Sequence, residues 1–109
     1  MHDTLLARIE ARRDELVELT RALVRIPTVN PPGENYPAIC ELLGERLRRR
    51  GFAVQMLRAT GSPGDGDRFP RTNLVARREG ARPGPCVHLN GHIDVVEAGL
   101  GWSVDPWAG

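Results

Sequence analysis

Hydrophobic positions in the first quarter of the chain repeat with a helical period. Between Thr4 and Arg25, leucine, isoleucine and valine recur three, four and seven residues apart, with charged residues between them. This spacing is typical of an amphipathic helix. Asp3 or Thr4 can cap its first turn. Pro27 ends it, because proline disfavours helical geometry in the preceding residue.

A proline-rich turn separates this helix from a second one. Residues 27–36 hold three prolines and a glycine, which neither a helix nor a central strand tolerates. Aliphatic side chains four residues apart then predict a helix over 37–50. Gly51 supplies its C-terminal stop.

The rest of the chain alternates between strand and loop patterns. An extended chain over 52–58 would place Phe52, Val54 and Met56 on one face, which predicts a strand there. A second, short strand is expected at 73–78, after a polar loop at 60–70. A third strand is expected at 86–90. Two helices followed by at least three strands indicate an α/β fold, whose sheet these residues leave incomplete.

Composition excludes several classes of protein. Fifteen arginines against 14 acidic residues leave a net charge of +1, without the basic excess of a nucleic-acid binder. No apolar run approaches the roughly 18 residues that span a membrane, and the N-terminus lacks an apolar signal core. We therefore expect a cytoplasmic protein without nucleic-acid or membrane partners. Cys40 and Cys86 are expected to be buried, reduced thiols.

The candidate chemistry lies in the segment CVHLNGHIDVV, where His92 and Asp94 follow an apolar stretch. Side chains two residues apart in an extended chain point to the same face. A neutral imidazole is a good zinc ligand, and a carboxylate commonly orients such a ligand. A satisfied polar pair at a strand end would also explain the pattern. His88 is either a further ligand or a buried histidine.

The distribution of charge favours a cation site near this segment. Residues 1–81 carry a net charge of +3, and residues 82–109 carry −2. Negative charge therefore gathers in the part of the chain that holds His92 and Asp94.

Five segments in order resemble one family of zinc peptidases and deacylases. The family includes acetylornithine deacetylase, succinyl-diaminopimelate desuccinylase, aminoacylase and carboxypeptidase G. The segments are LVRIPTVNPPGE, GFAV, RTNLVARREG, HLNGHIDVV and GWSVDPWAG. The last two are the most specific, above all the GHxDVV core.

The resemblance implies a fold and two site residues. Residues 1–109 would be the N-terminal portion of a three-layer αβα catalytic domain, with the remainder and any dimerisation domain outside them. His92 matches a histidine that binds one of two metal ions, zinc in most cases and cobalt or manganese as alternatives. Asp94 matches the catalytic aspartate that holds this imidazole.

Other positions match the family as scaffolding or depart from it. The stretch that usually reads Trp-x-x-Asp-Pro-Phe is matched by four residues, which we interpret as structural: Trp102, Asp105, Pro106 and Trp107. Trp107 replaces the usual phenylalanine. Glu97 stands where the family usually has proline and adds a carboxylate near the site.

The implied reaction is metal-assisted hydrolysis of an amide. Metal ions polarise the carbonyl and lower the pKa of a bound water, and a glutamate acts as general base. The resemblance places this glutamate and the other ligands downstream of residue 109. The expected parent enzyme hydrolyses N-acylated amino acids or small peptides, often as a homodimer, while the 109 residues alone are inactive and expose apolar surface. Alternatives are a dipeptidase or carboxypeptidase of the same family and a non-catalytic scaffold.

Overall fold

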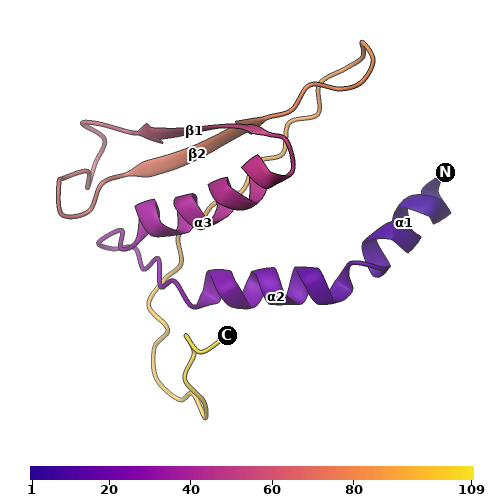
Figure 1. The fold of residues 1–109 in the computed structure, drawn as a ribbon. Coiled ribbons are helices and arrows are strands. Elements are labelled where there is room, and N and C mark those ends of the chain that lie inside the picture. Colours follow the sequence, from indigo (N-terminus) through magenta and orange to yellow (C-terminus); the bar gives the residue numbers. More distant parts are fainter. The chain divides into compact units, whose positions relative to one another are not determined.

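The computed structural model describes residues 1–109, which form three helices followed by two strands (Figure 1). The elements are α1 His2–Glu10, α2 Arg13–Val24, α3 Tyr36–Arg49, β1 Ala53–Arg58 and β2 Thr72–Arg77. The chain divides into two compact units, one of residues 1–27 with 98–109 and the other of residues 28–97. No helix combines the length and the apolar character needed to cross a bilayer.

The first unit contains α1 and α2, where the sequence predicted one continuous helix. That prediction is wrong at residues 11–12, where the helix breaks and Arg12 leaves helical geometry with φ −108° and ψ 14°. The stretch from Glu10 to Glu15 carries no large apolar side chain, so no packing holds this turn. Met1, not Asp3 or Thr4, occupies the N-cap position of α1.

The end of the chain belongs to the same unit as α2. The Arg25 Nε donates to the Ala108 carbonyl over 3.0 Å, and Asp105 closes a turn by accepting the Trp107 backbone N–H over 2.9 Å. The Trp102 indole donates to the Ala98 carbonyl over 2.7 Å. The helix α2 ends at Val24, ahead of Pro27 as predicted.

The second unit is a β-hairpin with α3 packed on one face (Figure 1). The strands are antiparallel, in a register that pairs Ala53 with Arg77 and Arg58 with Thr72. Side chains at alternate strand positions face the helix and are the less exposed ones. The small core includes Ile39 and Cys40 from α3, which are 5% and 0% exposed.

A glycine allows α3 to approach the hairpin closely. A Cβ atom at Gly44 would lie 2.9 Å from the Met56 Cε and 3.3 Å from the Val54 Cγ1. Both distances are shorter than an ordinary carbon–carbon contact of about 3.5–4.0 Å. The missing side chain therefore sets the separation of helix and sheet.

The predicted third strand at 86–90 is wrong, because residues 86–94 belong to no strand. A strand needs a neighbour to satisfy its backbone N–H and C=O groups. This segment finds one only beyond its end, in a parallel bridge between Val29 and Val95. Val87 and Leu89 remain 81% and 88% exposed. The α/β class is thus confirmed, with a two-stranded antiparallel sheet.

The two thiols are free, and they differ in burial. Cys40 is buried in the core, as predicted, and burial raises the pKa of its thiol. Its sulfur lies 3.7 Å from the Thr72 carbonyl. Cys86 is exposed, so the prediction of burial is wrong there. It lies in the segment that lacks a strand partner.

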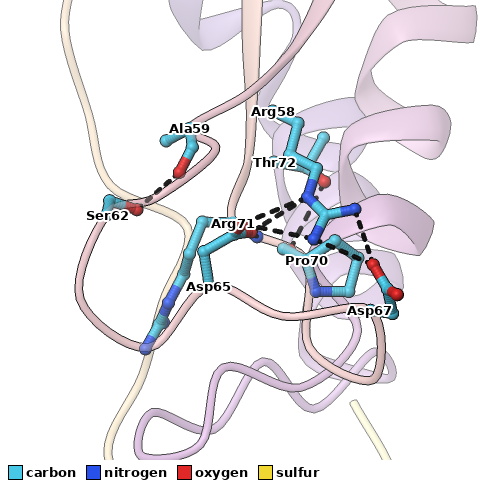
Figure 2. A network of polar contacts seen from close by, with 8 residues as sticks. All are labelled: Arg58, Ala59, Ser62, Asp65, Asp67, Pro70, Arg71 and Thr72. Carbon is cyan, nitrogen blue, oxygen red and sulfur yellow. Dashed lines mark hydrogen bonds and ion pairs between the residues drawn. The ribbon is translucent and has the colours of Figure 1, made fainter.

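An ion-pair network closes the loop between the strands (Figure 2). The Arg58 guanidinium donates to Asp65, with Nε 3.0 Å from Oδ1, and to Asp67 over 3.2 Å. Asp65 also accepts the backbone N–H of Arg71 over 2.9 Å. The Asp65 side chain is only 4% exposed, whereas that of Asp67 is fully exposed. The polar loop predicted from sequence is therefore tied to β1 at its base.

The Arg58–Asp65 pair predicts a pH dependence of the hairpin. Hydrogen bonds from Arg58, and then from the Arg71 backbone, hold the pKa of Asp65 below its ordinary value. The stabilisation is therefore complete above the unfolded-state value of about 3.9 and is lost as pH falls through the lower folded-state pKa. We expect NMR titration to find this lowered pKa, and Arg58→Met to raise it. Asp67→Asn is the control, and an equal rise in that variant would contradict the assignment.

Candidate metal site

Three backbone and hydroxyl contacts hold the segment that carries the candidate residues. The Asn30 N–H donates to the Val95 carbonyl over 2.9 Å, and the Val95 N–H donates to the Thr28 carbonyl over 3.0 Å. The Thr28 hydroxyl donates to the Ile93 carbonyl over 2.5 Å. Thr28 is 2% exposed. Residues 93–95 are thereby fixed to the turn that precedes α3.

His92 and Asp94 lie together, as the sequence predicted. The His92 Nδ1 is 2.9 Å from the Asp94 carbonyl oxygen and 3.1 Å from the Asp94 Oδ1. Both partners are acceptors, so Nδ1 must carry the hydrogen and donate. The lone pair of the neutral ring is then on Nε2, and the side chain is 84% exposed. This is the tautomer in which a histidine can bind a cation through Nε2.

The second oxygen of Asp94 joins a network that the sequence did not reveal. The Asn30 Nδ2 donates to the Asp94 Oδ2 over 3.3 Å. The Arg71 Nη1 donates to the Asn30 Oδ1 and to the Tyr36 hydroxyl, each over 3.1 Å. The hydrogen bond from Asn30 is the main reason that the pKa of Asp94 is lowered, and His92 adds to it. The carboxylate is thus kept ionised.

Tyr36 stays protonated beside this carboxylate. Burial first, and the charge of Asp94 second, raise the pKa of its phenol, while Arg71 opposes them. The signal for these partners was present in the motifs: Asn30 lies in NPPGE and Arg71 begins RTNLVARREG. Neither residue has a recognisable role until the fold brings together positions 41 residues apart.

An open depression of about 440 Å³ adjoins the pair. Its lining includes polar and apolar side chains from α3, β2 and the 90–94 segment, among them Tyr36, Leu43, Leu74, His92 and Asp94. A larger hollow of about 580 Å³ lies in the 77–87 loop and contains neither His92 nor Asp94. The candidate metal site therefore adjoins the smaller depression.

The chain brings one candidate ligand to this place. Nowhere in residues 1–109 do three or more histidine, cysteine, aspartate or glutamate side chains gather as a metal would need. Zinc sites use three or four protein ligands. His88 is exposed in the unpaired segment, so it is not the buried histidine that the sequence offered as one interpretation. Any complete site requires ligands from outside these residues.

Comparison with known proteins points to one group of enzymes. Succinyl-diaminopimelate desuccinylase of Sphingopyxis alaskensis is 35% identical over 97 residues, which are 89% of this chain and 24% of that protein. The desuccinylase of Rhodospirillum rubrum is 43% identical over 89 residues, or 82% of this chain and 20% of that protein. A Bacillus subtilis N-formyl-4-amino-5-aminomethyl-2-methylpyrimidine deformylase is 28% identical over 108 residues, which are 95% of this chain and 24% of that protein.

The chain spans about a quarter or less of the length of these curated relatives. No family profile matches it, and no solved structure matches it. The desuccinylase similarity nevertheless recurs in several organisms and covers most of the chain each time. Over the residues compared, the chain belongs to the peptidase and deacylase family that includes succinyl-diaminopimelate desuccinylase.

Proposed function

We propose that this chain is the N-terminal portion of the catalytic domain of a metal-dependent deacylase. The parent enzyme hydrolyses the amide bond of N-acylated amino acids or related small molecules. The observation that carries the proposal is the contact of the His92 Nδ1 with two oxygens of Asp94, which leaves Nε2 of this exposed side chain to bind a cation.

The residues present fit one metal ligand and its supporting carboxylate. Metal-binding histidines almost always donate their other ring N–H to a carboxylate, a carbonyl or water, and His92 donates to both a carbonyl and a carboxylate. Imidazole suits zinc, and cobalt is an alternative for the same donor set. When bound, the metal would supply Lewis-acid activation of the substrate carbonyl and of water.

The role of this chain in the reaction is to hold the ligand. Asp94 fixes the ring orientation and increases the basicity of Nε2 through the hydrogen bond at Nδ1. The adjoining depression offers space next to this imidazole. The remaining ligands and the general base come from elsewhere in the parent protein. A second copy of the parent protein, in a homodimer, is a further proposed partner.

The names of the relatives favour a deacylase over a peptidase. One group is named for removal of a succinyl group and another for removal of a formyl group from a named N-formyl compound. Both are acyl transfers to water, although the acyl groups and the leaving amines differ. We therefore propose acyl-group removal for this chain's parent and leave the acyl group itself to a substrate panel.

A chimeric enzyme tests the proposal. The matching segment of the Rhodospirillum rubrum desuccinylase, 43% identical over 89 residues, is replaced with the corresponding residues of this chain. We expect the chimera to retain zinc through dialysis and to hydrolyse succinyl-diaminopimelate. The 109-residue chain alone is expected to lose zinc, because it supplies a single ligand. A chimera that melts like the parent but holds no metal and has no activity would support a non-catalytic scaffold instead.

A further inference from the structure

We propose that Asn30 and Arg71 are positioning residues for His92 and act through Asp94. Arg71 orients the amide of Asn30, and Asn30 holds the Asp94 carboxylate so that its other oxygen accepts from the imidazole. That the imidazole is held in order to bind a metal rests on the proposed function. The series of hydrogen bonds from Arg71 through Asn30 and Asp94 to His92, here called the relay, does not rest on it.

The first link fixes which end of the Asn30 amide faces which neighbour. An asparagine side chain has an acceptor at one end and a donor at the other, whereas a guanidinium can only donate. The contact of the Arg71 Nη1 with the Asn30 Oδ1 therefore turns Nδ2 toward Asp94. A flipped amide would place N–H against the guanidinium and oxygen against the carboxylate, which is unfavourable at both ends.

The second link divides the two oxygens of Asp94 between two donors. Oδ2 accepts from Asn30 over 3.3 Å, and Oδ1 accepts from His92 over 3.1 Å. Rotation of the carboxylate would break both hydrogen bonds together. Without Asn30, Oδ2 would lose this side-chain donor. Asn30 is therefore the residue that limits how freely the imidazole can reorient.

Arg71 is held in place from several sides. Its backbone N–H donates to Asp65 over 2.9 Å, as Figure 2 shows, and its carbonyl accepts from Ala59 over 2.7 Å. Its guanidinium carbon lies 5.5 Å from the centre of the Tyr36 ring. These contacts come from the hairpin loop and from α3, so the position of the cation is set by the fold of the second unit.

Two glycines leave the space that the guanidinium occupies. A Cβ atom at Gly33, which has φ +100°, would lie 2.5 Å from the Arg71 Nη1, and one at Gly64 would clash with Nη2. The Arg71 Nε is buried without a hydrogen-bond partner, and such a donor is unfavourable. The side chain therefore does not satisfy all of its own donors. Its Nη1 instead serves Asn30 and Tyr36.

The relay can be tested without unfolding the turn. The bridge between residues 28–30 and 93–95 uses backbone groups and the Thr28 hydroxyl, none of which is removed by Asn30→Ala. Hydrogen exchange at the Val95 amide reports this bridge. It separates loss of positioning from loss of structure.

The experiment measures the tautomer of His92 directly. Solid-state NMR of the ¹⁵N-histidine-labelled 109-residue chain, with chelator and in a mildly alkaline buffer, distinguishes the two neutral tautomers of the ring. We expect the Nδ1–H form to dominate at His92. Asn30→Ala should shift the tautomer ratio about 2- to 10-fold toward Nε2–H, the size of one hydrogen bond. Arg71→Met should shift it in the same direction. The double variant should add little, because the residues act in series.

Each outcome decides the proposal. An unchanged tautomer ratio in Asn30→Ala, with the Val95 amide still protected, would overturn it. If Asn30→Ala loses protection of the Val95 amide, the tautomer ratio in Arg71→Met decides in the same way, because that variant leaves residue 30 intact. Loss of protection in both variants would also overturn it, since the two side chains would then hold the turn itself. Gln55→Ala, on the exposed side of β1, is the matched control. Because metal is absent, failure of the proposed function would show in the chimera and not here.

Discussion

Hydrolysis by the chimera is expected to fall at least about a thousandfold when His92 is replaced with alanine. A metal ion supplies several kcal/mol of transition-state stabilisation, and each 1.36 kcal/mol corresponds to about tenfold in rate. The variant removes the only candidate ligand that this segment brings to the site. Metal content should fall by one equivalent in the same sample.

The companion variant Asp94→Asn is expected to have a smaller effect. It keeps the shape of the side chain but removes the charge that supports the His92 Nδ1–H. Loss of such a supporting group typically costs about 10–100-fold in metal affinity or activity. The prediction therefore includes the order of the two rates: the His92→Ala chimera should be slower than the Asp94→Asn chimera. Metal content and rate measured as a function of zinc concentration will separate weaker binding from slower chemistry.

His88→Ala is the matched control for both variants. His88 is four residues from His92 and exposed, so its removal should leave rate and metal content unchanged. The assignment would be wrong if His92→Ala kept both its metal and its activity. It would also be wrong if His88→Ala were the more damaging of the two substitutions.

Local patterns predicted those elements whose packing is also local. The observed bounds of α3, β1 and β2 lie within one residue of the ranges expected from periodicity. Helix α3 has the regular apolar spacing of one buried face, and in both strands the less exposed side chains stand at alternate positions. The contact between His92 and Asp94 is likewise local, since an extended chain brings positions two apart to one face.

Longer-range features could not be predicted in this way. The break at Ala11–Arg12 occurs where no buried contact stabilises the turn, and neither α1 nor α2 has a buried residue. The strand expected at 86–90 has the right composition, but it lacks a neighbouring strand within residues 1–109. The contact of Arg71 with Asn30 depends on two loops that meet only in the folded hairpin unit.

The 109-residue chain by itself is expected to self-associate instead of behaving as a monomer that melts cooperatively. Its accessible surface is 8901 Å². A compact protein of 12.0 kDa exposes about 6,000 Å², and two separate compact bodies with the sizes of the two units would expose about 7,000 Å². The observed surface exceeds either of these two areas by more than the roughly 800 Å² that one partner loses in a standard interface. Under the proposed function, the remainder of the catalytic domain would cover this surface in the parent protein.

The exposed surface is apolar in places that can be changed one at a time. Val87 and Leu89, in the segment without a strand partner, are 81% and 88% exposed. Exposed apolar patches of this kind favour association. We expect light scattering to show species well above 12.0 kDa at micromolar concentration. Val87→Glu with Leu89→Glu should reduce the associated fraction severalfold without altering the β1–β2 pairing.

A control variant makes the test specific, because it has the net charge of the Val87→Glu, Leu89→Glu variant but keeps the apolar surface of the wild type. Gln55→Glu with Asn73→Glu, at exposed positions of the hairpin, also changes the net charge from +1 to −1. If this control disperses the chain equally well, charge and not apolar area governs association. A wild-type chain that is monodisperse at 12.0 kDa and melts cooperatively would show that residues 1–109 need no covering partner. The proposal that they are one part of a larger catalytic domain would then lose its physical support, because the missing strands and helices are what this surface is expected to bind.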